Sequence, residues 1–193
     1  LIDTEGKGVE EITTNGLVFN NKEYKVDCLI YATGFEVGTS YTRRSGYDVL
    51  GKNKISLSKK WEDGIRTMHG MHVEGFPNCL IMGQQQSAFT VNYPHLLNEQ
   101  SKNIAYIVKH SYKNKIKALE VSEEAEEEWV QTIIESAQIA IGFLESCTPG
   151  YYNNEGNPTE RSAQDGSYGG GPIAFFALME KWREEGNLKG LIS

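Results

Sequence analysis

The sequence has few cysteines and no long apolar run, and both features narrow the class of protein. Three cysteines stand among 193 residues, at Cys28, Cys79 and Cys147. Their odd number and irregular spacing give neither a disulfide framework nor a zinc motif, and the first two lie in apolar runs where a free thiol behaves as a small hydrophobic side chain. No stretch is apolar enough over sufficient length to span a bilayer, and no signal peptide is recognisable. We therefore expect a cytoplasmic protein without a membrane partner.

Positive charge is also scarce. Lys and Arg number 19 against 26 Asp and Glu, which gives a formal net charge of −7. Nucleic-acid-binding proteins present a basic surface, so we expect no nucleic-acid partner. The acidic run at 123–128 predicts a solvated helix start. The chain is long enough to bury a core, and its first residue, Leu1 in place of Met, suggests that the sequence is incomplete at its N-terminus.

The first half of the chain predicts short strands. Alternating apolar and polar residues, separated by Asn-Gly and Asn-Asn turn dipeptides, predict antiparallel strands at 9–12, 16–19 and 24–26. Two continuous apolar runs, 28–32 and 79–82, are typical of strands buried on both faces, and each is followed by a small-residue turn. The residues between them, 38–75, show little periodicity and predict an extended excursion with short strands.

The second half predicts helices. Apolar residues recur at steps of three and four from 91 to 110, with Pro94 in the first turn. Ser122 is a suitable N-cap for a second helix, whose apolar stripe would comprise Trp129, Ile133, Ala137, Ala140 and Leu144. A third helix is predicted to begin at Pro172 and to stop at Gly186.

The segment Gly83–Asn92, which reads GQQQSAFTVN, is the strongest candidate for chemistry. It joins an apolar run to a helix N-terminus and supplies uncharged donors and acceptors. Such a terminus presents unpaired N–H groups and the positive end of the helix dipole, which suit an anion or a polarised carbonyl. A polar loop that only caps its own helix has the same composition, so the residues alone leave both interpretations open.

Four segments together resemble one family of flavoproteins. Asp27–Phe35, DCLIYATGF, is similar to a fingerprint of flavin-dependent class B monooxygenases, and Gly75–Gly83, GFPNCLIMG, is similar to the downstream strand of their Baeyer–Villiger branch. The resemblance continues through Cys147–Asn154 and Tyr168–Pro172 in the family's order, and so covers nearly the whole chain. It implies an α/β fold, here the C-terminal part of a FAD-binding flavoprotein with two dinucleotide-binding domains, in which short strands are followed by long helices.

The resemblance also implies a division of the chain and a set of cofactor contacts. It makes residues 1–110 the C-terminal part of the FAD-binding domain and residues 111–193 a helical extension. The family's cofactor contacts fall on Thr33, Gly34, Gln86, Ser87, Ala88 and Asn92. In the family, backbone N–H groups at the strand-to-helix junction meet the carbonyls of the flavin ring, whose reduced form carries negative charge.

The activity that the resemblance implies is a Baeyer–Villiger oxidation. NADPH reduces FAD, and one oxygen atom from O2 is inserted next to a ketone carbonyl to give an ester or lactone. The GxGxxG motif for the ADP half of FAD, the NADPH-binding unit and the segments that hold the family's active-site Arg are not in this sequence. We therefore expect the remainder of the same enzyme as partner, a small-molecule ketone and O2 as substrates, and no activity from the isolated chain.

One segment departs from the family pattern. Residues 148–171 predict a polar, Gly-rich loop of unusual length. In relatives, a mobile loop at this place presents a Trp to the active site. Here Gly150 stands where that Trp would be, and the ring and hydroxyl of Tyr151 make it the candidate for the same role.

Other classes of function stay open. A flavin-containing monooxygenase that forms S- or N-oxides is one alternative, and a non-catalytic interaction domain on a flavin fold is another. A pyridine-nucleotide reductase is disfavoured by Gln84 and by the lack of a redox-active cysteine pair. His69 and His72 have an HxxH spacing, but no third ligand is evident, so we expect surface histidines and no metal site.

Overall fold

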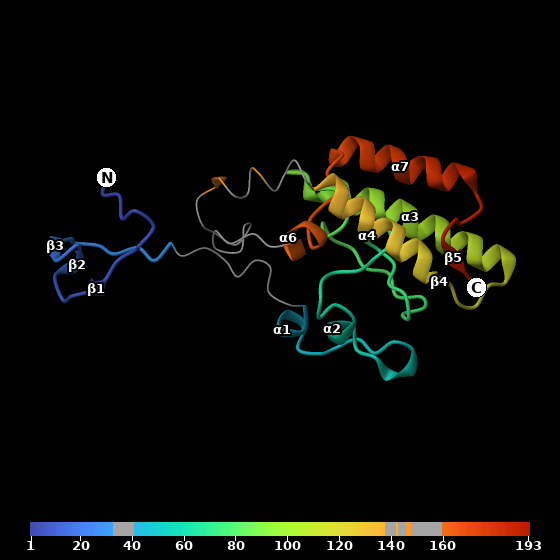
Figure 1. The fold of residues 1–193 in the computed structure, drawn as a ribbon, viewed down its shortest axis with the longest axis horizontal. Coiled ribbons are helices and arrows are strands. Elements are labelled where there is room, and N and C mark those ends of the chain that lie inside the picture. Colours follow the sequence, from blue (N-terminus) through green and yellow to red (C-terminus); the bar gives the residue numbers. More distant parts are fainter. Residues whose placement is uncertain (33–40, 138–141, 143–145, 148–159) are drawn as a thin grey trace.

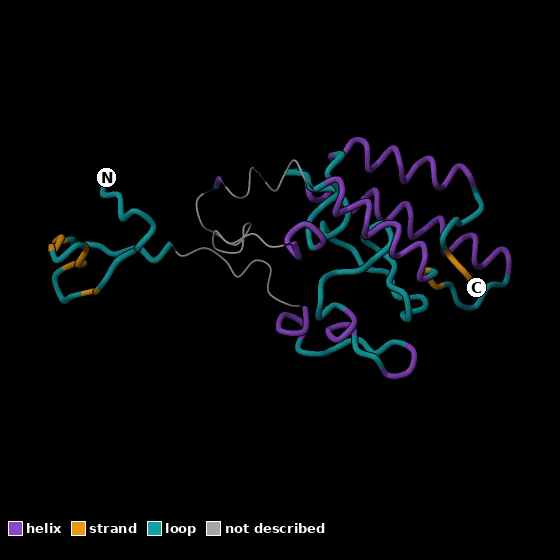
Figure 2. Tube along the Cα trace, in the orientation of Figure 1, coloured by secondary structure: helices purple, strands orange, loops and turns teal. Residues whose placement is uncertain are grey.

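The computed structural model describes residues 1–32, 41–137, 142, 146–147 and 160–193. Within these ranges the chain forms a small N-terminal sheet, a middle region of short helices, and a layer of long helices (Figure 1). The sheet lies apart from the helical layer, whereas the middle region lies against one side of it. Figure 2 shows the same division, with regular strands confined mainly to the N-terminal end and helices dominating the other end.

The N-terminal sheet is a three-stranded antiparallel meander. Its strands are β1 (Glu11–Ile12), β2 (Gly16–Phe19) and β3 (Lys22–Lys25), in the order β1-β2-β3. Asn20 and Asn21 form the second turn with φ of 51° and 58°, the left-handed conformation that a two-residue hairpin turn needs and that Asn tolerates. The predicted meander is confirmed, with small shifts in its bounds.

Three long helices follow from the predicted patterns. They are α3 (Tyr93–Asn114), α4 (Glu123–Ser136) and α7 (Gly171–Glu185). The Ser122 side chain caps α4 by accepting a hydrogen bond from Ala125 N at 3.2 Å. Gly186, with φ of 71°, ends α7 at the predicted residue, because glycine adopts this left-handed conformation without a Cβ clash. α3 runs across the predicted domain boundary at residue 110 and packs against α7.

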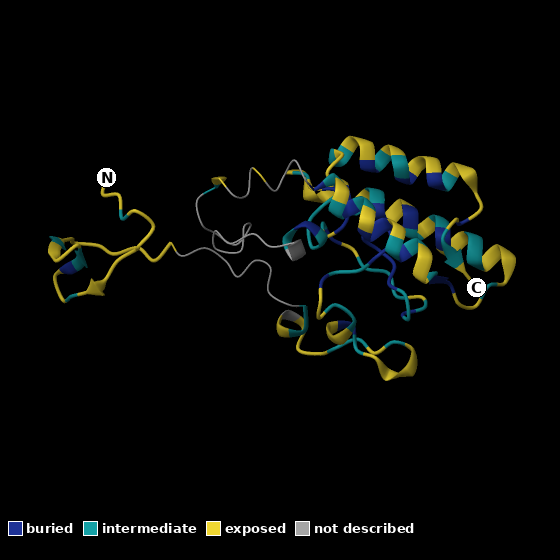
Figure 3. Cartoon of the chain, in the orientation of Figure 1, coloured by how far each residue is buried: buried dark blue, intermediate teal, exposed yellow. Residues whose placement is uncertain are grey.

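The main core lies between these helices. Leu96 of α3, Trp129 and Ile133 of α4, and Phe175 and Met179 of α7 are buried together. Figure 3 shows buried stretches on the sides of the helices that face one another and exposed stretches on the outer sides. A second cluster consists of Ile107, Leu119, Trp182 and Leu188. Burial of this apolar area, at roughly 25 cal/mol per Å2, is the main source of stability for the layer.

Two short strands connect the ends of the helical layer. β4 (Glu120–Val121) pairs antiparallel with β5 (Leu191–Ile192), with Val121 opposite Leu191. This pair ties the residues after α7 to the start of α4. None of the helices in the described part of the chain has the length and hydropathy needed to cross a bilayer.

The middle region is helical where short strands were expected. It contains α1 (Tyr41–Ser45), the 3-10 helix η1 (Lys52–Lys54) and α2 (Leu57–Lys60). Its described residues pair only as isolated bridges, Leu50 with Ser56 and Met68 with His72. The prediction of short strands was wrong because local side-chain bonds favour turns here: Ser56, for example, caps α2 by accepting a hydrogen bond from Lys59 N.

The two apolar runs that predicted buried strands form no strand in this chain. Leu29, Ile30 and Tyr31 are 38%, 79% and 70% exposed, and Cys28 is exposed as well. The second run, 79–82, has no regular secondary structure and is mostly half-buried. A strand buried on both faces needs a neighbouring strand on each side, and the described part of the chain supplies none at either run.

The predicted long loop contains a short helix. α6 (Glu160–Gln164) packs against α4, so the second part of residues 148–171 is ordered by tertiary contact. Residues 148–159, which include Tyr151, lie outside the described residues.

Candidate functional site

The structure describes four of the six predicted cofactor contacts. Gln86, Ser87 and Ala88 lie together in the segment that precedes α3, and each is 0% exposed. Asn92 is exposed and is the N-cap of α3, where its side chain accepts a hydrogen bond from His95 N at 3.2 Å. Thr33 and Gly34 lie outside the described residues.

The candidate site is built on a compact turn, which we call the Gly83 turn and define as residues 83–88. The helix begins only at Tyr93, so the turn itself is not helical. Ser87 Oγ donates to Gly83 O at 2.6 Å and closes the turn on itself. Gln100 of α3 holds the same glycine twice, because its Nε2 donates to Gly83 O at 2.8 Å and its Oε1 accepts from Gly83 N at 3.1 Å.

Gln100 is a residue that the sequence patterns did not single out. It is 2% exposed and lies on the buried face of α3, in line with Leu96, Asn103 and Ile107. Two amide side chains, Gln100 and Asn103, on the same face as Leu96 and Ile107 are the signal that could have found it, since a buried amide needs hydrogen-bond partners.

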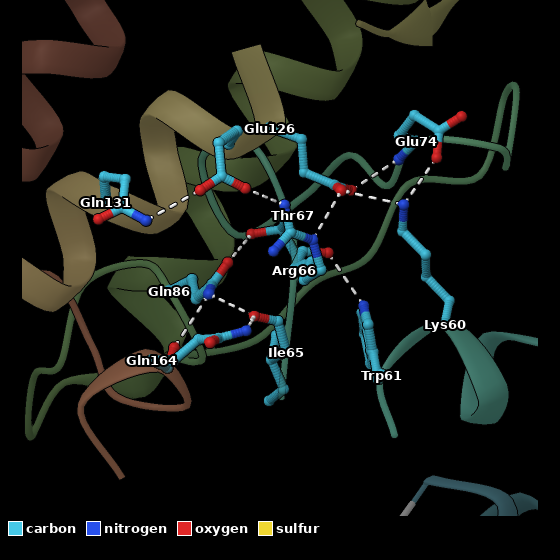
Figure 4. A network of polar contacts seen from close by, with 11 residues as sticks. Lys60, Trp61, Ile65, Arg66, Thr67, Glu74, Gln86, Glu126, Gln131 and Gln164 are labelled. Atoms are coloured by element: carbon cyan, nitrogen blue, oxygen red, sulfur yellow. Dashed lines mark hydrogen bonds and ion pairs between the residues drawn. The ribbon is translucent and has the colours of Figure 1, made fainter. Parts of the chain in front are cut away.

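Gln86 is the centre of the turn. Its φ of 51° is uncommon for a residue with a side chain. Its Oε1 accepts from Thr67 Oγ1 at 2.7 Å, and its Nε2 donates to the carbonyl oxygens of Ile65 at 2.7 Å and Gln164 at 2.9 Å. Figure 4 shows this amide between the segment 65–67 and the end of α6.

A second segment, 165–168, lies along the Gly83 turn. Gln86 N donates to Gly166 O at 2.7 Å, and Tyr168 N donates to Ser87 O at 2.8 Å. Ser167 Oγ adds a bond to Gln84 O at 3.0 Å. Trp129 of α4 covers the turn from the core side and donates its indole N–H to Gln86 O at 2.9 Å. The turn is therefore held by four parts of the chain, namely α3, α4 and the segments 65–67 and 164–168.

The surface beyond the turn is apolar and uncharged. Phe89, Val91 and Tyr93 are 51%, 103% and 43% exposed, and Asn92 is exposed between them. No residue from Gly83 to Pro94 carries a charge. Exposed apolar side chains beside a few amides suit a flat, largely apolar ring with a polar edge. The chemistry of this surface thus fits a flavin ring. Gln86, Ser87 and Ala88 are buried and do not form part of the surface.

A buried carboxylate joins the middle region to α4. The side chain of Glu126 is 1% exposed and accepts from Glu74 N at 2.8 Å. Lys60 Nζ and Arg66 Nε lie 3.1 Å and 3.3 Å from its Oε2 (Figure 4). Burial disfavours both cations, but hydrogen bonds to Glu74 and Glu126 raise the pKa of Lys60, and those to Glu127 and Glu126 raise the pKa of Arg66.

The two histidines of the HxxH motif are buried, so the expectation of surface histidines was wrong. His69 is 8% exposed and His72 is 5% exposed. The ring of His69 makes edge contacts with those of Trp129 and Trp182, at 4.8 Å and 5.8 Å between centroids. Burial lowers the pKa of His69 to about 3, with a further contribution from His72, and lowers the pKa of His72 to about 4. Both rings are therefore neutral near pH 7.

Among the described residues, no group of three or more His, Cys, Asp or Glu side chains is arranged to hold a metal ion. The apolar and aromatic neighbours of His69 explain its burial as core packing.

Known proteins resemble this chain over its whole length. Neopentalenolactone D synthase of Streptomyces avermitilis is 47% identical over 193 residues, Baeyer-Villiger monooxygenase ATR8 of Stachybotrys chlorohalonatus is 41% identical over 192, and FAD-binding monooxygenase hmp7 of Hypomyces subiculosus is 37% identical over 191. Each match covers 99% of this chain but only 31% to 32% of the relative. The chain thus spans about a third of the length of the curated relatives it matches. No protein-family model matches it.

Solved structures give the same result. A polycyclic ketone monooxygenase from Thermothelomyces thermophila matches with a TM-score of 0.83 at 32% identity, over 100% of this chain and 32% of that one. A steroid monooxygenase bound to NADP matches with a TM-score of 0.79 at 20% identity, over 100% of this chain and 35% of the other, which shows a common fold.

The fold and the relatives define the class: the chain is homologous to part of the FAD-binding monooxygenases. Within that class, it corresponds to a C-terminal portion of the Baeyer–Villiger monooxygenases, as the sequence motifs predicted.

Proposed function

We propose that the whole protein is an FAD- and NADPH-dependent monooxygenase that inserts one oxygen atom next to a ketone carbonyl, giving an ester or lactone. The observation that carries the proposal is the 41% identity, over 192 residues, to Baeyer-Villiger monooxygenase ATR8. The names of two relatives, an FAD-binding monooxygenase and a steroid monooxygenase bound to NADP, support the two cofactors.

The proposed substrates are a cyclic ketone and O2. The polycyclic ketone monooxygenase, at 32% identity, supports the ketone. The proposed partner of this chain is the remainder of the same enzyme, since the relatives are about three times as long as their match to it. The proposed location is the cytoplasm, which the odd number and irregular spacing of the cysteines support, because they give no disulfide framework.

In this proposal, the segment 83–92 and the start of α3 border the flavin. FAD, when bound, supplies the redox chemistry and the activation of oxygen. The residues of this chain orient the ring and exclude water: Phe89 and Val91 offer apolar surface, and Asn92 offers an amide at the helix N-terminus. A neutral, dipolar surface suits a ring whose charge changes during turnover, because it stabilises the anionic form without a fixed cation.

The contacts at Thr33 and Gly34 and the loop role of Tyr151 remain proposals that rest on the family resemblance. The division into residues 1–110, the end of the FAD-binding domain, and 111–193, a helical extension, is likewise proposed. α3 crosses this boundary, so the two parts share one helix.

The experiment that tests the function uses the full-length protein. NADPH oxidation is followed with and without a cyclic ketone, and the organic product is identified by mass spectrometry. We expect a yellow protein whose NADPH oxidation accelerates with ketone and whose product is an ester or lactone. Formation of S- or N-oxides alone would assign the protein to the flavin-containing monooxygenases, and a protein without bound flavin would support the non-catalytic alternative.

A further inference from the structure

Gln86 was expected to touch the cofactor, but the structure gives it no exposed surface. The residue is 0% exposed even in this chain, which forms only part of the proposed site. A ligand could reach its amide only if the Gly83 turn opened. Any influence of Gln86 on a bound ring must therefore pass through the residues that it holds.

The hydrogen bonds of Gln86 match an amide side chain and no other. Its Oε1 accepts one bond, from Thr67, and its Nε2 donates two, to the carbonyl oxygens of Ile65 and Gln164. Both main-chain groups are also bonded, the N–H to Gly166 and the carbonyl oxygen to Trp129. A carboxylate lacks the two donors, and a thioether has no donor and only a weak acceptor. Neither Glu nor Met can therefore replace this residue without leaving buried polar groups poorly paired.

The backbone at Gln86 is held in an unfavourable conformation by these contacts. With φ at 51°, it lies in the left-handed region, which a residue with a Cβ occupies only where its surroundings determine it. Residues 65–67, 83–88 and 164–168 are far apart in the sequence and meet at this side chain (Figure 4). The turn that results leads directly into the exposed segment Phe89–Asn92.

We infer that Gln86 is a positioning residue: its amide locks the Gly83 turn to residues 65–67 and 164–168, and this lock sets where Phe89–Asn92 stand against the flavin ring. The inference rests on the proposed function, in which that exposed segment borders the ring. In this inference Gln86 does not touch the flavin but acts on it indirectly. Its amide is needed for the yield of ester per NADPH consumed, and not only for the binding of FAD.

The test uses the full-length, FAD-loaded enzyme with three single substitutions. Gln86→Met keeps the side-chain length and removes all three amide bonds. Thr67→Val removes only one of these three, the bond to Oε1, together with the bond that Thr67 Oγ1 accepts from Gly70 N. Gln131→Met is the matched control, because this exposed glutamine of α4 bonds only to Glu127 in the described structure and lies outside the site. For each variant, FAD occupancy, the visible spectrum and reduction potential of the flavin, and the ester formed per NADPH consumed are measured.

We expect Gln86→Met to retain FAD, to shift the flavin spectrum and potential, and to lower the ester yield per NADPH about tenfold or more, since small misplacements at a reacting centre cost up to about a hundredfold. Thr67→Val changes the same quantities in the same direction by less. The double variant resembles Gln86→Met, because both changes break one network. Gln131→Met matches the wild type.

A folded, FAD-loaded Gln86→Met enzyme with wild-type spectrum, potential and ester yield would overturn the inference. If that variant does not fold, Thr67→Val decides by the same criteria, because it removes only one of the three bonds of the Gln86 amide. A wild-type protein that binds FAD but oxygenates no ketone would refute the proposed function, while the spectrum and potential of the variants would still test Gln86. A wild-type protein that binds no flavin would overturn both.

Discussion

Buried polar side chains connect segments of this chain that lie far apart in the sequence. Each does so through hydrogen bonds or ion pairs to residues outside its own segment. Gln86 joins two loops, Gln100 joins the Gly83 turn to α3, and Glu126 joins α4 to the middle region. The acidic run was expected to be a solvated helix start, yet Glu126 lies 0% exposed within it. Sequence composition did not reveal this because its partners, Lys60 and Arg66, lie about 60 positions earlier.

Removal of the Glu126 carboxylate tests its structural role. We expect Glu126→Ala to lower the free energy of unfolding by about 2–4 kcal/mol, since the change leaves Glu74 N and two partly buried cations without their shared partner. Glu127→Ala is the control: its side chain is 47% exposed, so loss of its pair with Arg66 costs about 1 kcal/mol or less. Urea denaturation measures both, and equal losses would contradict this account.

The buried histidines predict a dependence of stability on pH. Unfolded histidine has a pKa of about 6.5, whereas burial holds the pKa of His69 at about 3 and that of His72 at about 4. Between about pH 6.5 and these values, the unfolded chain binds more protons than the folded one, so the free energy of unfolding falls as pH falls. The expected slope is up to about 1.4 kcal/mol per pH unit for each histidine.

Denaturation of the chain between pH 7 and pH 5 measures this slope. His69→Phe keeps a ring between Trp129 and Trp182 but cannot take up a proton, so it should reduce the slope. His110→Phe, on α3 and outside this cluster, is the matched control. If the free energy of unfolding had the same pH slope in both variants as in the wild type, the assignment of this slope to buried His69 would be contradicted.

At the scale of elements, the helices were predictable because their signals are local. Ser122 as N-cap, Pro94 in the first turn of α3 and Gly186 as the stop of α7 all stand where the sequence placed them. The structure of the apolar runs 28–32 and 79–82 was not predictable in this way, because strand formation depends on neighbouring strands that the described chain does not contain. α6 was missed for the same reason: its order comes from packing on α4.

The N-cap of α4 gives a prediction at this scale. Ser122→Ala removes the bond from Ala125 N and should lower the free energy of unfolding by about 1 kcal/mol. Ser122→Thr retains a capping hydroxyl and serves as control. Thermal unfolding of both variants measures the difference, and a loss in Ser122→Thr as large as in Ser122→Ala would show that the cap is not the cause.

At the scale of the whole molecule, the chain exposes apolar surface that the proposed remainder of the enzyme would cover. The run 28–32 is exposed, and its described backbone makes one hydrogen bond, from Ala32 N to Ile30 O. The matched relatives are about three times longer than their match to this chain. We propose that the remainder of the enzyme supplies the strands that would pair with this run.

Hydrogen exchange tests whether the run becomes a strand. In the 193-residue chain, the amides of Leu29, Ile30 and Tyr31 should exchange at nearly the rate of an unfolded peptide. In the full-length protein, we expect exchange slower by about two orders of magnitude or more, because the amides join a buried sheet. The amides at the centre of α4 are protected in both and serve as the internal reference. Fast exchange at 28–32 in both proteins would contradict the proposed neighbouring strands.

The measurement that tests the central proposal most directly is the origin of the oxygen in the product. The full-length protein is supplied with NADPH, a cyclic ketone and 18O2, and the product is analysed by mass spectrometry. A Baeyer–Villiger monooxygenase gives a lactone that carries one 18O atom from the gas. An unlabelled lactone, or NADPH oxidation without any oxygenated product, would contradict the proposal that this chain is part of such an enzyme.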